Sequence, residues 1–254
     1  MDQFTLSIIT TIFISSIAGY LGSLLITKRM ALVGGPLGHL ALPGVALALI
    51  YNFGIFLGAL LSIAVGALLI WIFSLRTKLP LEALTAIVFA AGVAIGFLFL
   101  PLSNAEEALI GDITRVTLSD TLLAVFLSSI LFVVINRIYP KIVLSEISED
   151  LAKSMGIDVR KYNLIYLSSI ALVAAMEVKI VGILLTAALI AIPAAASRNV
   201  SRDLTQYSFL SLIFGAVSGV IAIILFKTLK LPVGPLMILV LFSLFLISLL
   251  FVKK

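Results

Sequence analysis

Residues 4–26 read FTLSIITTIFISSIAGYLGSLLI, a run of 23 positions without a charged side chain. About 20 such residues are enough for a helix to cross about 30 Å of hydrocarbon, so this run predicts a membrane-spanning helix. A secretory signal has a positive segment before its apolar run, whereas this run is preceded by Asp2 and by no lysine or arginine. We therefore expect the first segment to be retained as a span.

The composition extends this prediction to the whole chain. Of the 254 residues, 62% are apolar and 11% charged, and the mean hydropathy is +1.29. Soluble domains have about 45–50% apolar and about 25% charged residues. The absence of cysteine excludes disulfides, thiolate metal sites and cysteine nucleophiles, and the single histidine, His39, excludes a multi-histidine zinc site within one chain. The net charge of +5 is ordinary for a membrane protein, so no nucleic-acid partner is expected.

Apolar runs recur along the chain and set the expected fold. We predict spans near 4–26, 31–51, 54–75, 80–101, 120–139, 163–178, 179–198, 207–226 and 233–251. The expected fold is all-α, a polytopic membrane domain over residues 1–254 with about eight to nine transmembrane helices. With nine spans and the N-terminus outside, thirteen of the 17 Lys and Arg residues lie inside, as the positive-inside rule requires.

A short cytoplasmic helix is predicted over residues 145–156. Ser145 or Ser148 can cap its start, and Gly156 is placed for a left-handed C-cap. Three apolar residues at every fourth position form one stripe: Ile147, Leu151 and Met155. The stripe either rests on the membrane or the bundle, or docks onto a cytoplasmic partner.

The chain has no G-x-x-x-x-G-K-[ST] phosphate loop. We therefore expect no enzyme activity in this chain, and any ATP that drives transport must be hydrolysed by another polypeptide.

The second span, 31–51, is interrupted by residues that weaken a helix: Gly34, Gly35, Pro36, Gly38, Pro43 and Gly44. Carbonyls freed at membrane depth are tolerated against protein or a water-filled cavity, which is where transporters place broken helices. His39 lies ten residues from Arg29, which is about 15 Å into the bilayer if the segment rises steeply. An ionisable group at that depth predicts a functional site, such as a ligand on a metal path. The alternative is a neutral imidazole that bonds a freed carbonyl and serves only packing.

Two other classes of function are weaker fits. A secondary transporter driven by an ion gradient needs a carboxylate deep in a span, and Glu177 lies at an inferred span end. A membrane-embedded enzyme needs a cluster of catalytic groups, which His39 alone does not provide. We expect Asp120 to be an N-cap with a structural role.

Three stretches resemble a known family: residues 28–34 continuing to 37–44, residues 151–157, and residues 179–185 continuing to 192–195. By their order and spacing, the chain resembles the membrane permease subunit of bacterial and archaeal ABC importers for zinc, manganese or iron. The similarity extends over nearly the whole chain. It implies a plasma-membrane permease that works with a separate ABC ATPase, which hydrolyses ATP, and with an extracellular or periplasmic metal-binding protein.

The resemblance also implies roles for particular residues. The permease would be a homodimer, or a dimer with a close paralogue, and residues 145–156 would be the coupling helix that docks into the ATPase. Glu106, Glu107 and Asp112 of an external loop would be contacts for the binding protein.

One position departs from the family pattern. That pattern in the second span is Gly-Asp-Ala-Leu-x-His, with an aspartate four residues before the histidine; here Gly35 and Pro36 stand where the aspartate and alanine are expected. His39 is therefore the ligand side chain that the resemblance carries over. Carbonyls and water, or a second His39 across a dimer, would complete the path.

Overall fold

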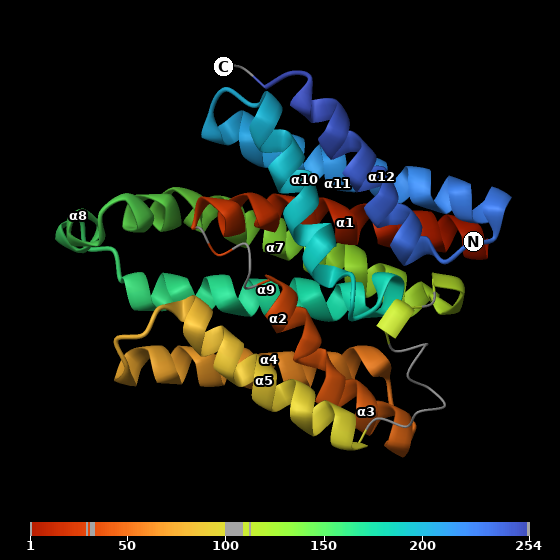
Figure 1. The fold of residues 1–254 in the computed structure, drawn as a ribbon, viewed down its shortest axis with the longest axis horizontal. Helices are drawn as coiled ribbons and strands as arrows, with labels where there is room; N and C mark the ends of the chain where they lie inside the picture. Colours follow the sequence, from red (N-terminus) through yellow and green to blue (C-terminus); the bar gives the residue numbers. More distant parts are fainter. Residues whose placement is uncertain (1, 29, 31–33, 100–108, 112, 253–254) are drawn as a thin grey trace.

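The structure is a computed structural model that describes residues 2–28, 30, 34–99, 109–111 and 113–252. These residues form helices and their connections, without a strand among them (Figure 1). The elements are α1 (Gln3–Thr27), α2 (Gly34–His39), α3 (Ala41–Tyr51), α4 (Ile55–Arg76), α5 (Leu81–Phe99), η2 (Ile113–Arg115), α7 (Leu118–Ile147), α8 (Glu149–Ser154), α9 (Val159–Val181), α10 (Thr186–Val200), α11 (Leu204–Leu229) and α12 (Val233–Leu249). The all-α prediction is confirmed.

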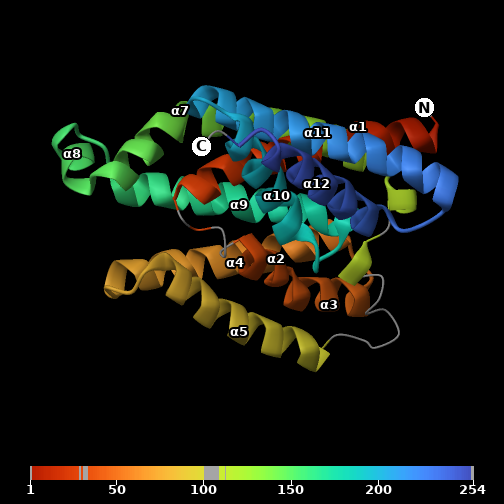
Figure 2. The same ribbon diagram turned by 45° about the horizontal axis from the view of Figure 1, so that its top comes forward.

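Helix α9 lies in the middle of the bundle, beside α1 and α7. Helices α4 and α5 lie on one side of it, and α11 and α12 lie on the other (Figures 1 and 2). Helix α1 packs against α7, α9, α10 and α11, whereas α3 packs mainly on α4 and α5. The short helix α8 stands at one end of the molecule, far from the N-terminus (Figure 1).

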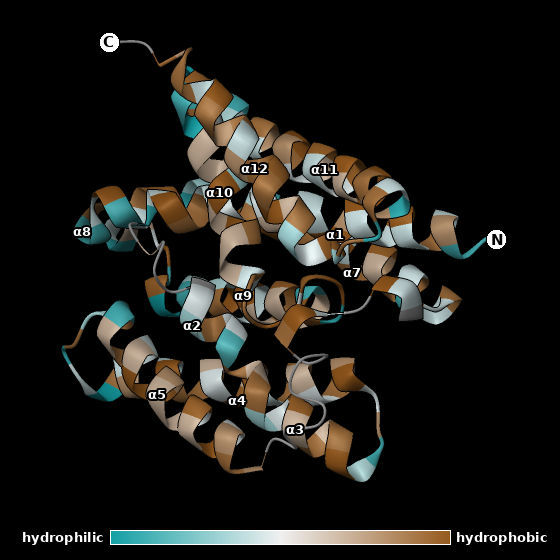
Figure 3. Ribbon diagram, turned by 45° about the vertical axis from the view of Figure 1, so that its right-hand side comes forward, coloured by the Kyte–Doolittle hydropathy of each residue, from teal (hydrophilic) through white to brown (hydrophobic). Residues whose placement is uncertain are grey.

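Six helices in the described residues are long and apolar enough to cross a membrane, namely α1, α4, α5, α7, α9 and α11. Their positions agree with six of the predicted spans. The remaining predicted spans correspond to shorter helices: α2 with α3, α10, and α12. The chain is thus a multi-pass helical membrane protein. Figure 3 shows apolar residues over most of the helices and hydrophilic residues gathered at α8 and other helix ends.

The predicted boundary between spans 163–178 and 179–198 is wrong. Helix α9 continues through Lys179 to Val181, and α10 begins only at Thr186. The chain turns at Gly182, whose φ of +82° is in a region that favours glycine. Lys179 lies in the last turn of α9, and its ammonium pairs with Asp120 of α7, at 2.5 Å from Oδ2.

Helix α7 has 30 residues and contains Pro140. Its N-cap is Thr117, not Asp120 as predicted; Asp120 occupies the third helical position of a capping box. The Thr117 amide donates to Asp120 Oδ2 at 2.7 Å, and the Asp120 amide donates to Thr117 Oγ1 at 3.3 Å. This reciprocal pair satisfies two amides that the helix start would leave free.

Candidate functional site

The second span is broken, but not at its glycines and prolines. Helix α2 ends at His39, Leu40 forms the turn, and α3 begins at Ala41. Four of the predicted breakers lie within α2 (Gly34, Gly35, Pro36 and Gly38) and two lie within α3 (Pro43 and Gly44). Both prolines stand in the first turn of their helix, where the missing N–H is not needed. The prolines therefore start the two helices, and the break falls beside the histidine.

Gly38 and Gly44 are positions of close helix packing. A Cβ atom on Gly38 would lie 2.0 Å from Thr186 Oγ1 of α10, and one on Gly44 would lie 1.9 Å from the carbonyl oxygen of Gly58 in α4. Pro43 and Gly44 also line an apolar groove of about 490 Å³ between α3, α4 and α5. The part that the breakers play in a transport path stays a prediction.

His39 is half-buried at the end of α2. Its Nδ1 lies 2.9 Å from the carbonyl oxygen of Gly35, and its ring meets Phe89 of α5 edge to face, with centroids 5.6 Å apart. A carbonyl only accepts, so Nδ1 is the donor in this bond, and in the neutral imidazole the lone pair is then on Nε2. Metal-binding histidines are held in this way, with one nitrogen on a carbonyl and the other facing the metal. A histidine that serves only helix packing would make the same hydrogen bond. The role of His39 therefore depends on the group that Nε2 contacts.

The break also affects the neighbouring backbone oxygens. Pro43 has no N–H, so it cannot donate to the carbonyl of His39. The carbonyl of Leu40 instead accepts a bond of 2.6 Å from Ser62 Oγ of α4. No group of three or more His, Cys, Asp or Glu side chains that could hold a metal occurs in the described part of the chain.

Glu177 differs from the prediction. It was expected at a span end, but it lies inside α9 and is fully buried. Neither carboxylate oxygen has a hydrogen-bond partner among the described residues. Sequence reasoning missed this burial because Glu177 is close along the chain to the charged Lys179, and two charges so close together are typical of the polar end of a helix.

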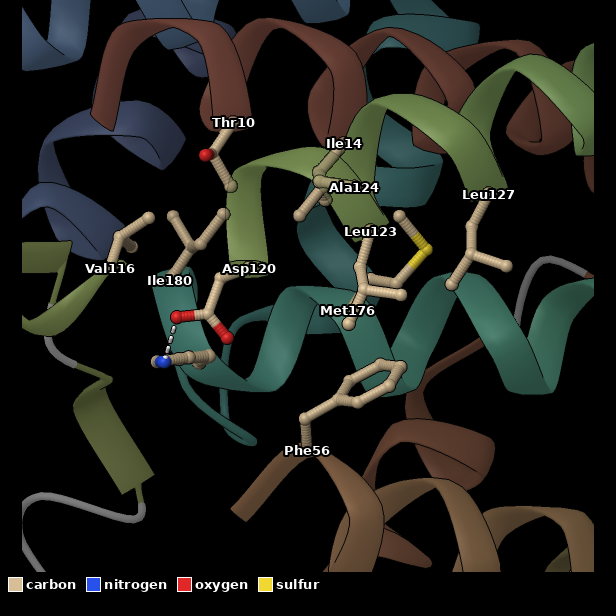
Figure 4. Close-up of a pocket in the computed structure, with 11 residues that line it drawn as sticks. Thr10, Ile14, Phe56, Val116, Asp120, Leu123, Ala124, Leu127, Met176 and Ile180 are labelled. Carbon is tan, nitrogen blue, oxygen red and sulfur yellow. Dashed lines mark hydrogen bonds and ion pairs between the residues drawn. The ribbon is translucent and has the colours of Figure 1, made fainter. Parts of the chain in front are cut away.

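A small cavity of about 30 Å³ lies between α1, α7 and α9 (Figure 4). Its walls are mostly apolar, and Asp120 and Lys179 close it with their ion pair. The aromatic ring of Phe56 approaches from α4 (Figure 4). Each charged group already has its partner here, so the pair serves as a structural link between α7 and α9.

The predicted helix over 145–156 is wrong in its start and correct in its end. Helix α7 ends at Ile147, because the backbone of Ser148 is extended. Ser148 is the N-cap of α8, and its hydroxyl oxygen accepts a hydrogen bond from the amide of Leu151. Of the two capping residues considered, Ser148 is the one used. Gly156 has a φ of +76°, as expected of a left-handed C-cap position.

The apolar stripe is exposed despite this break. The exposed fractions are 75% for Ile147, 48% for Leu151 and 64% for Met155, whereas Ala152 is buried against the bundle. The stripe therefore does not rest on its own bundle, which removes one of the alternatives. Within α8, Lys153 pairs with Glu149 at 2.8 Å, and this contact raises the pKa of Lys153.

A polar cleft of about 960 Å³ opens beside α8. Residues from the ends of α1, α4, α5, α7 and α9 line it together with α8. Its charged and polar members include Lys28, Glu82, Glu146, Glu149, Arg160 and Asn163. Sequence reasoning missed Lys28 and Asn163, because a lysine after a span looks like an ordinary positive-inside charge. Glu106, Glu107 and Asp112, the predicted contacts for a binding protein, lie outside the described residues.

Comparison with known proteins gives a family match over residues 1–252, to the ABC 3 transport family. The manganese transport system membrane protein MntC of Listeria innocua is 26% identical over 252 residues, which cover 98% of this chain and 90% of that protein. The high-affinity zinc uptake system membrane protein ZnuB of Buchnera aphidicola is 29% identical over 232 residues, covering 88% of each.

A solved structure agrees with these relatives. PsaBC from Streptococcus pneumoniae, in complex with Fab, contains a chain that matches with a TM-score of 0.84 and 25% identity, covering 98% of this chain and 91% of the other. The all-helical, multi-pass architecture of the described residues agrees with this assignment. The chain belongs to the ABC-3 transport family and is the permease component of an ABC importer, with the ATPase on a separate subunit.

Proposed function

We propose that this permease moves a divalent metal ion, either manganese or zinc or else iron, along a path that passes His39. The observation that carries the proposal is the orientation of the imidazole, which the Gly35 carbonyl holds with Nε2 available as a ligand. Relatives named for manganese and for zinc support the class of ion. The metal is cargo, so a site with few ligands suits it, because the ion must leave as readily as it enters.

The same proposal says which end of the molecule is cytoplasmic and which end is outside. Helix α8 docks into the ATPase through Leu151 and Met155, with Ile147 at the edge of that contact and Gly156 closing the helix. This end is then cytoplasmic, the N-terminus is outside, and the opposite end receives the metal-binding protein. The exposure of three apolar side chains on a charged segment supports a protein partner for this surface.

Two copies of the chain form the importer in this proposal, and the second copy brings its own His39 to the path. The position of the family aspartate is occupied by Gly35, which contributes a backbone carbonyl and no side chain. Mass measurement of the purified complex tests the dimer, and a complex with a single permease copy would contradict it.

Elemental analysis gives the first test. Cells lacking the chain and cells carrying it are grown with scarce zinc, manganese and iron, and a selective fall in one metal identifies the cargo. His39→Ala should lower uptake of that metal about tenfold or more at equal protein level. The matched control is Ile50→Ala, an exposed position of the same span. Unchanged uptake in His39→Ala would return the histidine to a packing role.

Docking of α8 has its own test. Leu151→Asp should abolish co-purification of the ATPase while membrane insertion is kept, because a carboxylate cannot enter an apolar contact unpaired. Leu151→Met, which keeps an apolar side chain of similar size, should retain the ATPase. Normal complex formation with Leu151→Asp would contradict the docking role.

A further inference from the structure

The apolar groove between α3, α4 and α5 lies on two membrane spans, at one side of the molecule (Figure 2). Its volume is about 490 Å³. Of the described residues that line it, Ser62 alone has a polar side chain, and that hydroxyl already donates to the carbonyl of Leu40. Large apolar side chains from both spans are exposed along the groove, including Leu61, Val65, Leu69, Ile87 and Ile95. The groove is therefore open at the depth of the lipid tails.

The floor of the groove is the break in the second span. Leu40, the residue between α2 and α3, lines the groove and is only 3% exposed. Its side chain reaches both walls, because a Cβ on Gly66 of α4 would lie 2.5 Å from Leu40 Cδ1 and one on Gly92 of α5 would lie 2.6 Å from Leu40 Cδ2. A molecule in the groove would therefore lie against the turn that follows His39.

An arginine continues the line of the groove at one end. Leu69 and Phe73 line the groove from α4, and Arg76 follows Phe73 by three positions, so it lies on the same face of that helix. Arg76 is exposed, and its guanidinium has no ion pair or hydrogen bond with the described residues. The charged residues nearest to it along the chain, Lys78 and Glu82, line the polar cleft beside α8 instead. The groove thus has an apolar length and an unpaired cation at its end.

We propose that this groove binds an anionic phospholipid, with one acyl chain along α4 and the phosphate on Arg76. The groove extends along α4 over residues 58–73, which is about 22 Å at 1.5 Å per residue. Half of the hydrocarbon layer is about 15 Å thick, so an acyl chain of one leaflet fits along it. A guanidinium binds phosphate through two parallel N–H donors, and basic groups beside spans recognise anionic lipid headgroups. The acyl chain would then cover Leu40 at the break.

The charge of Arg76 favours a lipid over a second copy of the chain as the occupant. Two copies in one membrane, related by a two-fold axis along the membrane normal, hold their Arg76 side chains at the same depth. A contact between copies along the groove would bring two arginines to the same end of an apolar interface, and the described lining residues include no carboxylate to neutralise them. A phosphate supplies the missing negative charge.

The test uses the single tryptophan of the chain, Trp71. Trp71→Phe gives a background without tryptophan, and Phe73→Trp then places one fluorophore in the groove. The purified chain is reconstituted in bilayers that contain dibrominated phosphatidylglycerol or dibrominated phosphatidylcholine, whose bromine atoms quench tryptophan on contact. We expect phosphatidylglycerol to be preferred about fivefold, the effect of one basic residue near a membrane surface. Phe242→Trp in the same background, at an exposed position of α12, should show no preference. Leu69→Trp reports on the same groove if Phe73→Trp does not fold.

Two pairs of variants separate the headgroup from the acyl chain. Arg76→Gln should abolish the preference for phosphatidylglycerol, whereas Lys78→Gln, an exposed lysine that lines the polar cleft, should keep it. Ala91→Phe fills the groove and should reduce quenching by both lipids, whereas Ala90→Phe, exposed but outside the groove, should not.

Three results would overturn the proposal. The first is equal quenching by the two lipids in Phe73→Trp, or a preference that survives Arg76→Gln. The second is unchanged quenching in Ala91→Phe. The third is an absence of quenching by either lipid, which would mean that protein, such as a second copy of the chain, fills the groove.

Discussion

Helices α1 and α9 differ from α5 and α7 in what surrounds them, although all four are apolar. In the most apolar 18-residue window of each helix, 72% of α1 and of α9 is buried inside the chain, against 28% of α5 and of α7. The two buried helices are the less apolar ones. Within a membrane, hydropathy thus identifies the spans, while a lower hydropathy identifies those at the centre.

The reason lies in how helices associate in lipid. Lipid tails are as apolar as leucine, so close packing and hydrogen bonds, not hydrophobicity, hold spans together. Helix α1 accordingly buries hydroxyl side chains: Ser7, Thr10, Thr11, Ser15 and Ser23. Thr10 bonds Thr121 of α7 at 2.8 Å, and Gly22 lies directly against α10. Helix α7 instead turns leucine and phenylalanine side chains outward.

The largest loss of stability is expected from a substitution where α1 packs against α10. A Cβ on Gly22 would lie 1.9 Å from the carbonyl oxygen of Ile190, and a backbone atom cannot rotate away. Gly22→Ala should therefore lower the free energy of unfolding by about 3 kcal/mol, measured by denaturant titration of the purified protein. Gly54→Ala, with its nearest neighbour 4.0 Å away, should be nearly neutral. Equal stability of the two variants would break the contrast between buried and peripheral positions.

A smaller effect is expected at the link between α7 and α9. Asp120 Oδ2 accepts from Lys179 Nζ at 2.5 Å and from the amide of Thr117 at 2.7 Å. Asp120→Ala removes both the ion pair and the carboxylate that accepts from the Thr117 amide in the capping box, and should cost about 2 kcal/mol in the same titration. Lys179→Met leaves the cap intact and should cost less. If the lysine variant were the less stable of the two, the cap would not contribute as described.

A smaller loss of stability is expected from removing one of the hydrogen bonds between α1 and α7. Tyr20 Oη donates to Asn136 Oδ1 at 3.0 Å. Tyr20→Phe removes this bond and keeps the ring, so a loss of about 0.6 kcal/mol is expected, the average for such bonds between membrane helices. Tyr51→Phe, at a position that is 72% exposed, is the control and should show no change. A stabilising Tyr20→Phe would argue against hydrogen bonding as a cause of association here.

The smallest effect is expected on the outer face of α7. Leu122 is 62% exposed, so Leu122→Ala should change stability by less than about 0.5 kcal/mol. The comparison is sharpest in the assembled importer, with thermal unfolding as the measurement. A loss as large as that of Gly22→Ala would mean that protein, and not lipid, covers this face of α7.

Most of the fold was predictable from the sequence, because apolar runs and turn residues identify helices locally. The predicted ranges 4–26, 54–75 and 80–101 agree with α1, α4 and α5 within a few residues. The predicted boundary near Lys179 was wrong because a lysine after an apolar run looks like the end of a span, and the sequence does not show that Asp120, 59 residues earlier, pairs with it. The predicted start of α8 was also wrong. Ser145 and Ser148 can both cap a helix, and the sequence does not show that α7 continues to Ile147, which leaves Ser148 as the N-cap.

The sequence identified His39 as the candidate site residue, but it did not predict the contacts of that residue. His39 stood out because an ionisable group in a span is rare. Its bond to Gly35 depends on the turn of α2, and the burial of Glu177 and Lys28 depends on neighbours distant in sequence. Patterns of hydropathy carry no information on such contacts.

The length of α7 also fixes where a partner can meet the chain. A helix of 30 residues is about 45 Å long at 1.5 Å per residue, whereas the hydrocarbon layer is about 30 Å thick. The helix is therefore about 15 Å longer than the hydrocarbon layer is thick, and α8 follows directly after its last residue, Ile147. One residue inserted near this end would move α8 by about 1.5 Å along the helix axis and turn it by about 100°. The register of α7 thus determines both how far from the membrane α8 is held and which way its apolar side chains face.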